Sequence, residues 1–114
     1  MGRSKDEHQI QCAIVEYLRI LHFLVFAVPN GGSRHPAEAA NLKREGVLAG
    51  TADLILVLQS KVVFIEIKTE KGFQSDSQEK FQKDIESLHH EYLIWRSLDD
   101  AIAWNKDQRN LLTL

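Results

Sequence analysis

Three residues in the middle of the chain, Asp53, Glu66 and Lys68, have the types and spacing that could do chemistry. Glu66 lies inside the apolar run 62–67, and a carboxylate in a buried strand is costly unless it is paired or bound to a metal. Because side chains alternate along a strand, Lys68 is expected on the same face as Glu66. A hairpin turn centred near Ser60 would bring Asp53 opposite Glu66 or within one diagonal of it. The sequence therefore predicts two carboxylates and an amine side by side.

A divalent cation would resolve the repulsion between the two carboxylates. Without one, either Asp53 or Glu66 would be expected to hold its proton at neutral pH. Ligation by carboxylates and a backbone carbonyl, here that of Ile67, favours Mg²⁺ or Mn²⁺ over zinc, since no cysteine or paired histidine lies near. Lys68 would then help to position the attacking water and stabilise charge on the phosphate. The alternative is a structural ion pair, in which one lysine would have to offset two acids.

The elements that must position these residues can be read from hydrophobic spacing. Two apolar runs separated by three polar residues predict a β-hairpin, and apolar residues three or four apart predict the helices around it. The resulting order, α, β, α, β, β, α, β, α, predicts an α/β fold with a mixed sheet flanked by helices. The expected helices are 5–21, 37–44, 75–89 and 97–105, and the expected strands are 23–28, 54–58, 62–67 and 92–95.

Composition restricts the class of protein. A chain of 114 residues, 44% hydrophobic and 26% charged, predicts one globular domain spanning 1–114. No apolar run approaches the roughly 20 residues that span a bilayer, and the charged N-terminus lacks a signal-peptide core, so we expect a cytoplasmic protein that does not bind membranes. The single cysteine, Cys12, is expected to be a core residue. A net charge of -2 means that any contact with a polyanion must be local and aided by cations.

The ordered motifs resemble a known nuclease family. Asp53 followed by Glu66-Ile67-Lys68 is similar to the PD-(D/E)XK motif, with Ala52 where proline often stands. The branch that the chain resembles most specifically is VRR-NUC. The segments that carry this resemblance cover nearly the whole chain: Pro29-Asn30-Gly31-Gly32, Gly50-Thr51-Ala52-Asp53-Leu54, Phe64-Ile65-Glu66-Ile67-Lys68, and Gln78 in a following helix.

This resemblance implies a restriction-endonuclease-like core and a metal-dependent endonuclease that hydrolyses phosphodiester bonds in DNA. Stand-alone members resemble virus-encoded proteins, which implies the cytoplasm of a bacterial or infected host cell. The family is associated with branched DNA, including four-way (Holliday) junctions. Symmetric cutting of a junction needs two active sites, so a chain this small is expected to act as a homodimer.

The resemblance also implies an acid on the first helix, where Glu7 and Glu16 are both available. Glu7 is favoured as a further metal ligand, because Glu7 and Gln11 continue the stripe of core-facing residues at 14 and 18, whereas Glu16 points away. Gln11 is accordingly a candidate for contact with nucleic acid. In the alternative interpretation, Ser4 and Glu7 form a capping box that satisfies the free N–H groups of the helix itself.

Gln78 carries the same ambiguity. The resemblance implies a glutamine near the active site, and the stripe through residues 81, 85 and 88 turns Gln78 toward the core. The amide could then hold the scissile phosphate or orient Lys68. The alternative is again a capping box, formed here with Ser75.

The loop between residues 29 and 36 is the candidate phosphate-binding segment. It offers flexible glycine backbone, an amide, a guanidinium and an imidazole, which together can cradle phosphates. An ordinary surface turn is the alternative. The nucleic-acid-binding candidates here are Asn30, Gly31, Gly32 and Arg34.

Two rivals to the nuclease hypothesis remain at this point. A nucleic-acid-binding module could keep the fold without cutting, although the complete set of Asp53, Glu66 and Lys68 argues against decay of a site. A structural domain could use the same acids only to pair with Lys68, and it would gain no stability from a divalent metal.

Overall fold

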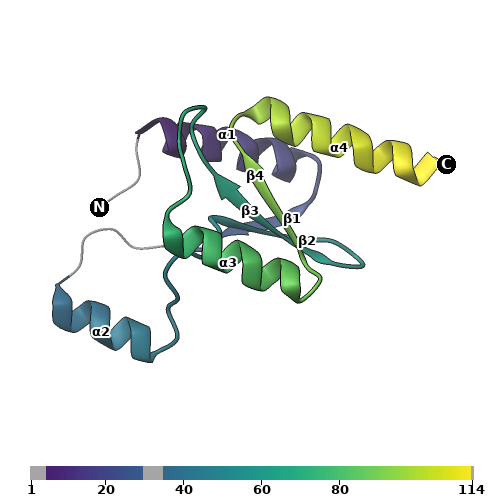
Figure 1. Ribbon diagram of the computed structural model, residues 1–114. Coiled ribbons are helices and arrows are strands. Elements are labelled where there is room, and N and C mark those ends of the chain that lie inside the picture. The colour runs from purple at the N-terminus through teal and green to yellow at the C-terminus, as the bar shows by residue number, and fades with distance from the viewer. Residues whose placement is uncertain (1–4, 30–34, 114) are drawn as a thin grey trace.

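A computed structural model describes residues 5–29 and 35–113 (Figure 1). The eight elements follow the predicted order. They are α1 (Lys5–Ile20), β1 (Leu24–Ala27), α2 (Pro36–Arg44), β2 (Leu54–Val57), β3 (Val62–Ile67), α3 (Asp76–Ser87), β4 (Glu91–Trp95) and α4 (Leu98–Thr113).

The last helix is longer than the sequence analysis predicted. It continues to Thr113 instead of ending at residue 105, because the residues after Asn105 include good helix formers such as Lys106 and Gln108. The prediction ended where apolar residues with packing partners end, whereas the helix continues through the polar residues 106–109. None of the described helices is long and apolar enough to cross a membrane.

The four strands form one mixed sheet in the order β1-β2-β3-β4. The first three strands are antiparallel neighbours, and β4 lies parallel to β3. In the central hairpin Leu54 pairs with Ile65 and Val57 pairs with Val62. This register centres the turn close to Ser60, as predicted, and it determines which side chains share each face of the sheet.

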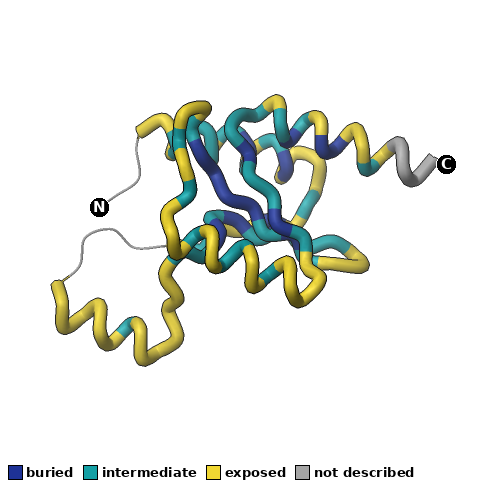
Figure 2. The backbone as a smooth tube through the Cα atoms, viewed as in Figure 1, coloured by how far each residue is buried: buried dark blue, intermediate teal, exposed yellow. Residues whose placement is uncertain are grey.

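One face of the sheet packs against α1 and α4 and contains the core. Side chains at alternate positions of the strands point to this face, where Ile14 and Leu18 of α1 cover them. Trp104 of α4 packs against Trp95 and Phe23 with ring centroids 5.9 and 5.6 Å away. Figure 2 shows the buried residues concentrated in the middle of the sheet. The strand residues of this core are Val25, Leu54, Leu56, Val63, Ile65, Ile67 and Trp95.

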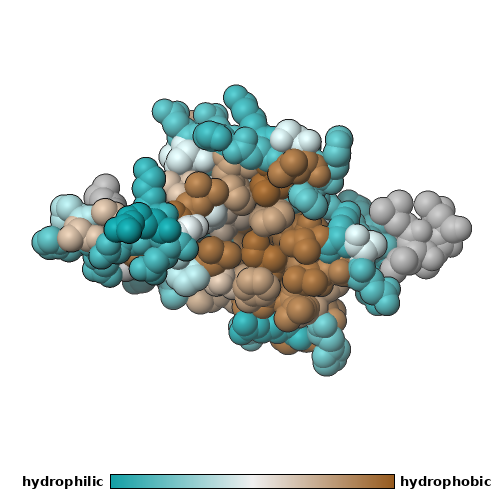
Figure 3. All heavy atoms as spheres, turned by 90° about the horizontal axis from the view of Figure 1, so that it is seen from below, coloured by the Kyte–Doolittle hydropathy of each residue, from teal (hydrophilic) through white to brown (hydrophobic). Residues whose placement is uncertain are grey.

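The opposite face is covered only in part, by α3. Phe81 of α3 packs on Phe64 and Tyr92, with ring centroids 5.7 and 6.1 Å apart. The β1 end of this face stays exposed, because Leu24 and Phe26 keep 61% and 45% of their surface accessible. Apolar side chains gather in the middle of the molecule when it is seen from below (Figure 3). The sheet therefore combines a closed core with an open apolar surface.

Helix α2 stands apart from this body. It begins with Pro36, and the side chain of His35 caps it by accepting a hydrogen bond from the Ala37 N–H at 3.2 Å. None of its residues is buried, and Figures 1 and 2 show it away from the sheet and mostly exposed. Two chain segments lead to it, of which the one after it ends at Asp53.

Candidate active site

The hairpin places Asp53 and Glu66 across from each other. Leu54 pairs with Ile65, so the register continued by one residue sets Asp53 opposite Glu66. One oxygen of Asp53, Oδ2, accepts the backbone N–H of Ile67 at 2.7 Å. This hydrogen bond ties the loop before β2 to the end of β3, and so fixes the position of the Asp53 carboxylate.

Glu66 is 1% exposed and is held at both of its carboxylate oxygens. Its Oε2 accepts a hydrogen bond from Gln78 Nε2 at 2.9 Å and lies 3.7 Å from Lys68 Nζ. Its Oε1 accepts a hydrogen bond from the Tyr92 hydroxyl at 3.2 Å. The buried carboxylate is thus oriented by hydrogen bonds at both oxygens, as buried polar groups require.

Burial, and next the neighbouring Asp53 carboxylate, raise the pKa of Glu66 from its ordinary 4.5 to about 8. Lys68 and the Tyr92 hydrogen bond act in the opposite direction and do not offset them. A self-sufficient ion pair would keep the acid ionised at neutral pH. Lys68 alone therefore does not offset the burial of Glu66 together with the neighbouring Asp53 carboxylate.

Lys68 lies where the alternation of β3 predicts it, on the Glu66 face, and it is only 9% exposed. Its backbone N–H donates to the carbonyl of Trp95 at 3.0 Å, which extends the β3–β4 pairing by one residue. The ammonium group is therefore carried by the rigid end of a strand. It can donate to a substrate atom that approaches Glu66.

Gln78 caps α3 and also contacts Glu66, two roles that the sequence analysis treated as alternatives. Its side-chain oxygen Oε1 accepts the backbone N–H of Ser75 at 2.8 Å. Its backbone N–H donates to Ser75 Oγ at 3.3 Å, which completes a capping box. The amide nitrogen of the same side chain donates to Glu66. Because the two ends of the amide point in different directions, the cap orients the donor toward the site.

Gly50 brings the chain before Asp53 against the start of α3. Its φ is +83°, and a Cβ added there would lie 2.3 Å from the Ser77 carbonyl oxygen and 2.8 Å from the Gln78 nitrogen. Only glycine allows both the backbone conformation and this close approach. The contact sets the distance between the segment that carries Asp53 and the helix that carries Gln78.

Arg96 holds the loop that joins Lys68 to α3. Its Nη1 donates to the carbonyl oxygens of Thr69 at 2.7 Å and Gly72 at 2.8 Å, and more weakly to that of Glu70 at 3.3 Å. A guanidinium can serve several acceptors in one plane. Arg96 thereby stiffens the path between the two parts of the site.

Tyr92 and Gln74 are site neighbours that the sequence analysis did not select. Gln74 Nε2 donates to the Tyr92 hydroxyl at 3.3 Å, and Tyr92 in turn donates to Glu66. Burial, and next the Glu66 charge, raise the pKa of Tyr92 above its ordinary value, so the phenol keeps its proton. No sequence pattern pointed to Tyr92, which lies on the Glu66 face because β4 pairs in parallel with β3 and sets Tyr92 opposite Phe64.

The candidates from the first helix lie on α1. Glu7 and Gln11 are both half-buried, in agreement with the inward-facing stripe, and Gln11 lines an open groove of about 640 Å³ that extends to Ala27 of β1. Within residues 5–29 and 35–113, no three or more acids, histidines or cysteines are grouped to hold a metal. Glu7 thus does not complete a set of three with Asp53 and Glu66 here, and its role as a ligand stays a prediction.

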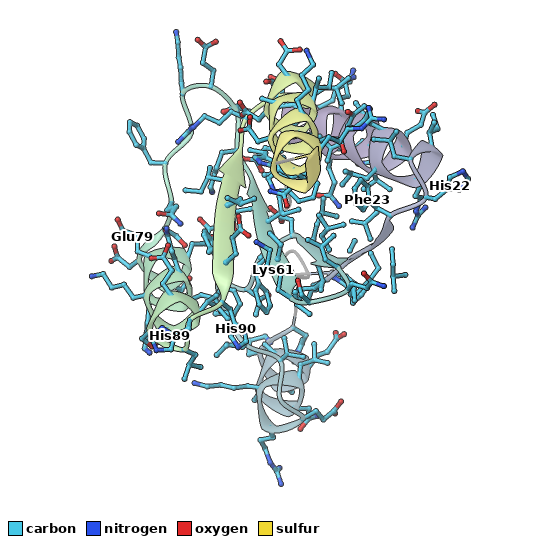
Figure 4. All side chains as sticks on the ribbon, turned by 90° about the vertical axis from the view of Figure 1, so that its right-hand side faces the viewer. His22, Phe23, Lys61, Glu79, His89 and His90 are labelled. Carbon is cyan, nitrogen blue, oxygen red and sulfur yellow. The ribbon has the colours of Figure 1, made fainter. Side chains whose placement is uncertain are left out.

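The structure does not describe the candidates in the loop between β1 and α2. Asn30, Gly31, Gly32 and Arg34 fall outside the described residues. His89 and His90 lie just beyond the end of α3, away from Glu79 at its start (Figure 4). His90 packs against Phe64 with ring centroids 6.4 Å apart, which accounts for its position. Cys12 was expected in the core, but this is wrong: it is exposed on α1.

The sequence matches no protein-family model and none of the curated proteins. Two solved structures, in contrast, are similar over most of their length. A "VRR_NUC domain protein" superposes with a TM-score of 0.73 at 18% identity, covering 93% of this chain and 89% of its own. A "VRR_NUC domain" superposes with a TM-score of 0.68 at 18% identity, covering 90% and 97%. The chain has the VRR_NUC fold.

This likeness confirms the α/β prediction of a mixed sheet flanked by helices, and it agrees with the resemblance read from the motifs. Within the VRR_NUC fold, Asp53 and Glu66 present carboxylate oxygens on adjacent strands, a donor type that suits Mg²⁺ and Mn²⁺. Mg²⁺ keeps several waters when it binds proteins, and it therefore needs few protein ligands. A cation bound beside Glu66 would favour its ionised form, against the burial and the neighbouring Asp53 charge that raise its pKa.

Proposed function

We propose that this chain is a Mg²⁺- or Mn²⁺-dependent endodeoxyribonuclease that hydrolyses phosphodiester bonds of branched DNA such as four-way junctions. The observation that carries the proposal is the grouping of Asp53, Glu66 and Lys68 at the start of β2 and the end of β3 in a VRR_NUC fold. A buried, strongly perturbed acid beside a second acid and a lysine is costly for stability alone, and such groups concentrate at functional sites.

In this proposal Asp53, Glu66 and the Ile67 carbonyl hold the metal, with Glu7 as a further candidate ligand. A bound Mg²⁺ or Mn²⁺ supplies positive charge against the phosphate oxygens and makes water more acidic. Lys68, carried by the end of β3, donates a hydrogen bond to the attacking water or to a phosphate oxygen. The water attacks phosphorus in line with the departing oxygen, so the placement of Lys68 next to Glu66 determines where the nucleophile is held.

Gln78 completes the catalytic group by positioning. One N–H of its amide donates to Glu66, and an amide nitrogen carries two, so the second can donate to the scissile phosphate. Gln11 and the loop residues Asn30, Gly31, Gly32 and Arg34 are proposed to contact the DNA backbone. Contacts of this kind fix the orientation of DNA without reading its sequence.

We further propose that the active form is a homodimer, since paired cuts in a junction need two sites. The exposed end of the sheet supports this, because Leu24 and Phe26 present apolar surface that a second copy would cover. Substituting Phe26→Lys should then give a monomeric mass at micromolar concentrations at which the parent chain is dimeric. Light scattering measures this directly, and a monomeric parent chain, with or without DNA, would remove the dimer from the proposal.

The function is tested by incubating labelled four-way junction, flap, single-stranded and linear duplex DNA with Mg²⁺, Mn²⁺ or EDTA. We expect junction cutting that EDTA abolishes and that Lys68→Ala lowers by about 10²-fold or more, as for loss of a donor to a developing charge. Lys83→Ala, on the exposed side of α3, is the matched control and should cut normally. Binding of DNA without cutting under every metal condition would instead identify a non-catalytic binding module.

A further inference from the structure

A hydrogen-bonded chain runs from the exposed side of α3 to the buried acid. Gln82 donates to Glu86 at 3.3 Å, and Gln82 Oε1 accepts from Gln74 Nε2 at 3.0 Å. The same Gln74 nitrogen donates to the Tyr92 hydroxyl at 3.3 Å, and Tyr92 donates to Glu66 Oε1 at 3.2 Å. Three polar side chains thus link two carboxylates, one exposed and one buried.

The carboxylate at the exposed end sets the direction of every bond in this chain. An ionised carboxylate only accepts hydrogen bonds, so Glu86 turns the amide nitrogen of Gln82 toward itself and leaves Gln82 Oε1 facing Gln74. Gln74 must then present its nitrogen, whose two hydrogens serve Gln82 and Tyr92. The Tyr92 oxygen accepts from Gln74, and its own hydrogen is therefore directed at Glu66.

We propose that Tyr92 is a positioning residue for the metal ligand Glu66, and that Gln74 acts through Tyr92 by fixing the direction of the phenol hydrogen. Tyr92 holds Oε1 while Gln78 holds Oε2, so the two donors prevent the carboxylate plane from rotating. A ligand whose orientation is fixed in advance binds its metal more tightly, because less is lost in ordering it. This inference rests on the proposed metal site.

A purely structural role for Tyr92 makes a different prediction. Its ring packs on Phe81 with centroids 6.1 Å apart, and Tyr92→Phe keeps that ring while removing only the hydroxyl. If the hydroxyl served the fold alone, its loss would lower the free energy of unfolding in EDTA and leave the metal affinity of the folded chain unchanged. Positioning instead predicts a loss of metal affinity.

The experiment is calorimetric titration of Mn²⁺ into the full chain at one fixed pH, with unfolding in EDTA measured beside it. Partners of metal ligands typically contribute 10- to 100-fold to affinity, so Tyr92→Phe should raise the dissociation constant about tenfold. The matched control is Tyr17→Phe, which removes a phenol that accepts from Asn105 at 3.2 Å in the α1–α4 layer. Its Mn²⁺ affinity should equal that of the parent chain.

Gln74→Ala tests the directional part of the proposal. Alone it should weaken Mn²⁺ binding less than Tyr92→Phe does, because the phenol can still donate but is no longer held in one direction. Combined with Tyr92→Phe it should add nothing, since Gln74 acts only through Tyr92. Additive losses would overturn this part, and the Gln74→Ala variant also serves if Tyr92→Phe does not fold.

The outcomes separate this inference from the proposed function. A parent chain that binds Mn²⁺ and a Tyr92→Phe variant that binds it equally well would overturn the positioning role alone. Tighter binding by the parent without DNA cutting would uphold positioning and refute the nuclease. A parent chain that binds no Mn²⁺ would refute the metal site and the role of Tyr92 together.

Discussion

The buried acid makes a quantitative prediction about stability and pH. With metal removed by EDTA, the pKa of Glu66 is about 8 in the folded chain, whereas its ordinary value of 4.5 applies in the unfolded chain. Between these values the folded state binds more protons than the unfolded state, so the free energy of unfolding falls as pH rises. Glu66→Gln has nearly the same shape and no proton to lose, and this dependence should vanish from it.

The size of the effect follows from the two pKa values. Each pH unit within this interval corresponds to about 1.4 kcal/mol, so the contribution of Glu66 changes by about 3 kcal/mol from pH 4.5 to pH 7. For a domain of this size that is a difference in Tm on the order of 10 °C. The exchange of one hydrogen-bonding group for another in the variant adds a cost that does not depend on pH. The slope, and not the offset, therefore carries the prediction.

The assay is urea unfolding of the parent chain and Glu66→Gln in EDTA at several pH values from 4 to 9. Stability of the parent relative to the variant should decline by about 1.4 kcal/mol per unit between roughly pH 5 and 7.5, and level off above pH 8. Glu79→Gln is the control, because Glu79 lies on the outer side of α3 in Figure 4 and is exposed. If the difference in free energy of unfolding between the parent and Glu66→Gln did not change with pH across this range, the pKa of Glu66 would not be raised by folding.

Two further predictions concern the supports of the site. Gly50→Ala should lower the free energy of unfolding by about 3 kcal/mol, because its Cβ would overlap the Ser77 carbonyl at a positive φ. Gly46→Ala is the control and should cost about 1 kcal/mol, since Gly46 has φ +108° but open space around it. Equal losses for the two variants in urea unfolding would contradict the contact between Gly50 and α3. Arg96→Gln should lower the free energy of unfolding by about 2 kcal/mol, because it releases the carbonyl groups of the loop between Lys68 and α3. Lys61→Gln, which breaks an exposed ion pair with Glu91, should lower it by under about 1 kcal/mol. The reverse order on thermal unfolding would argue against a stabilising role of Arg96.

The arrangement of Asp53, Glu66 and Lys68 could be predicted from the sequence because it depends on local geometry. Two apolar runs joined by three residues leave little freedom of register, and alternation along one strand fixes the face of each side chain. The observed pairing of Leu54 with Ile65 follows from these two constraints. Short-range patterns therefore sufficed for the centre of the site.

The surroundings of Glu66 depended on long-range pairing that the pattern does not encode. Tyr92 reaches the acid only because β4 lies parallel to β3 with Phe64 opposite Tyr92, and the crossover through α3 determines that register. Gln78 was recognised, but capping and site contact were set against each other. An amide has a donor end and an acceptor end, and here each performs one of the two roles.

Exposure also limited the sequence analysis. The end of α4 was missed because the polar residues 106–109 show no apolar spacing, and Cys12 was misplaced because residue type alone suggested burial. The uncovered surface at Leu24 and Phe26 reads in the sequence as an ordinary buried strand. An exposed edge strand and a strand in a core can have the same pattern.

We propose that the chain cuts DNA with a metal held by Asp53 and Glu66. This is tested by measuring cleavage of a labelled four-way junction by the parent chain and by Glu66→Gln across a Mn²⁺ titration. We expect cutting by the parent that rises with Mn²⁺ and disappears in EDTA, and no cutting by the folded variant at any concentration. Metal-dependent cutting by Glu66→Gln at the rate of the parent would contradict it.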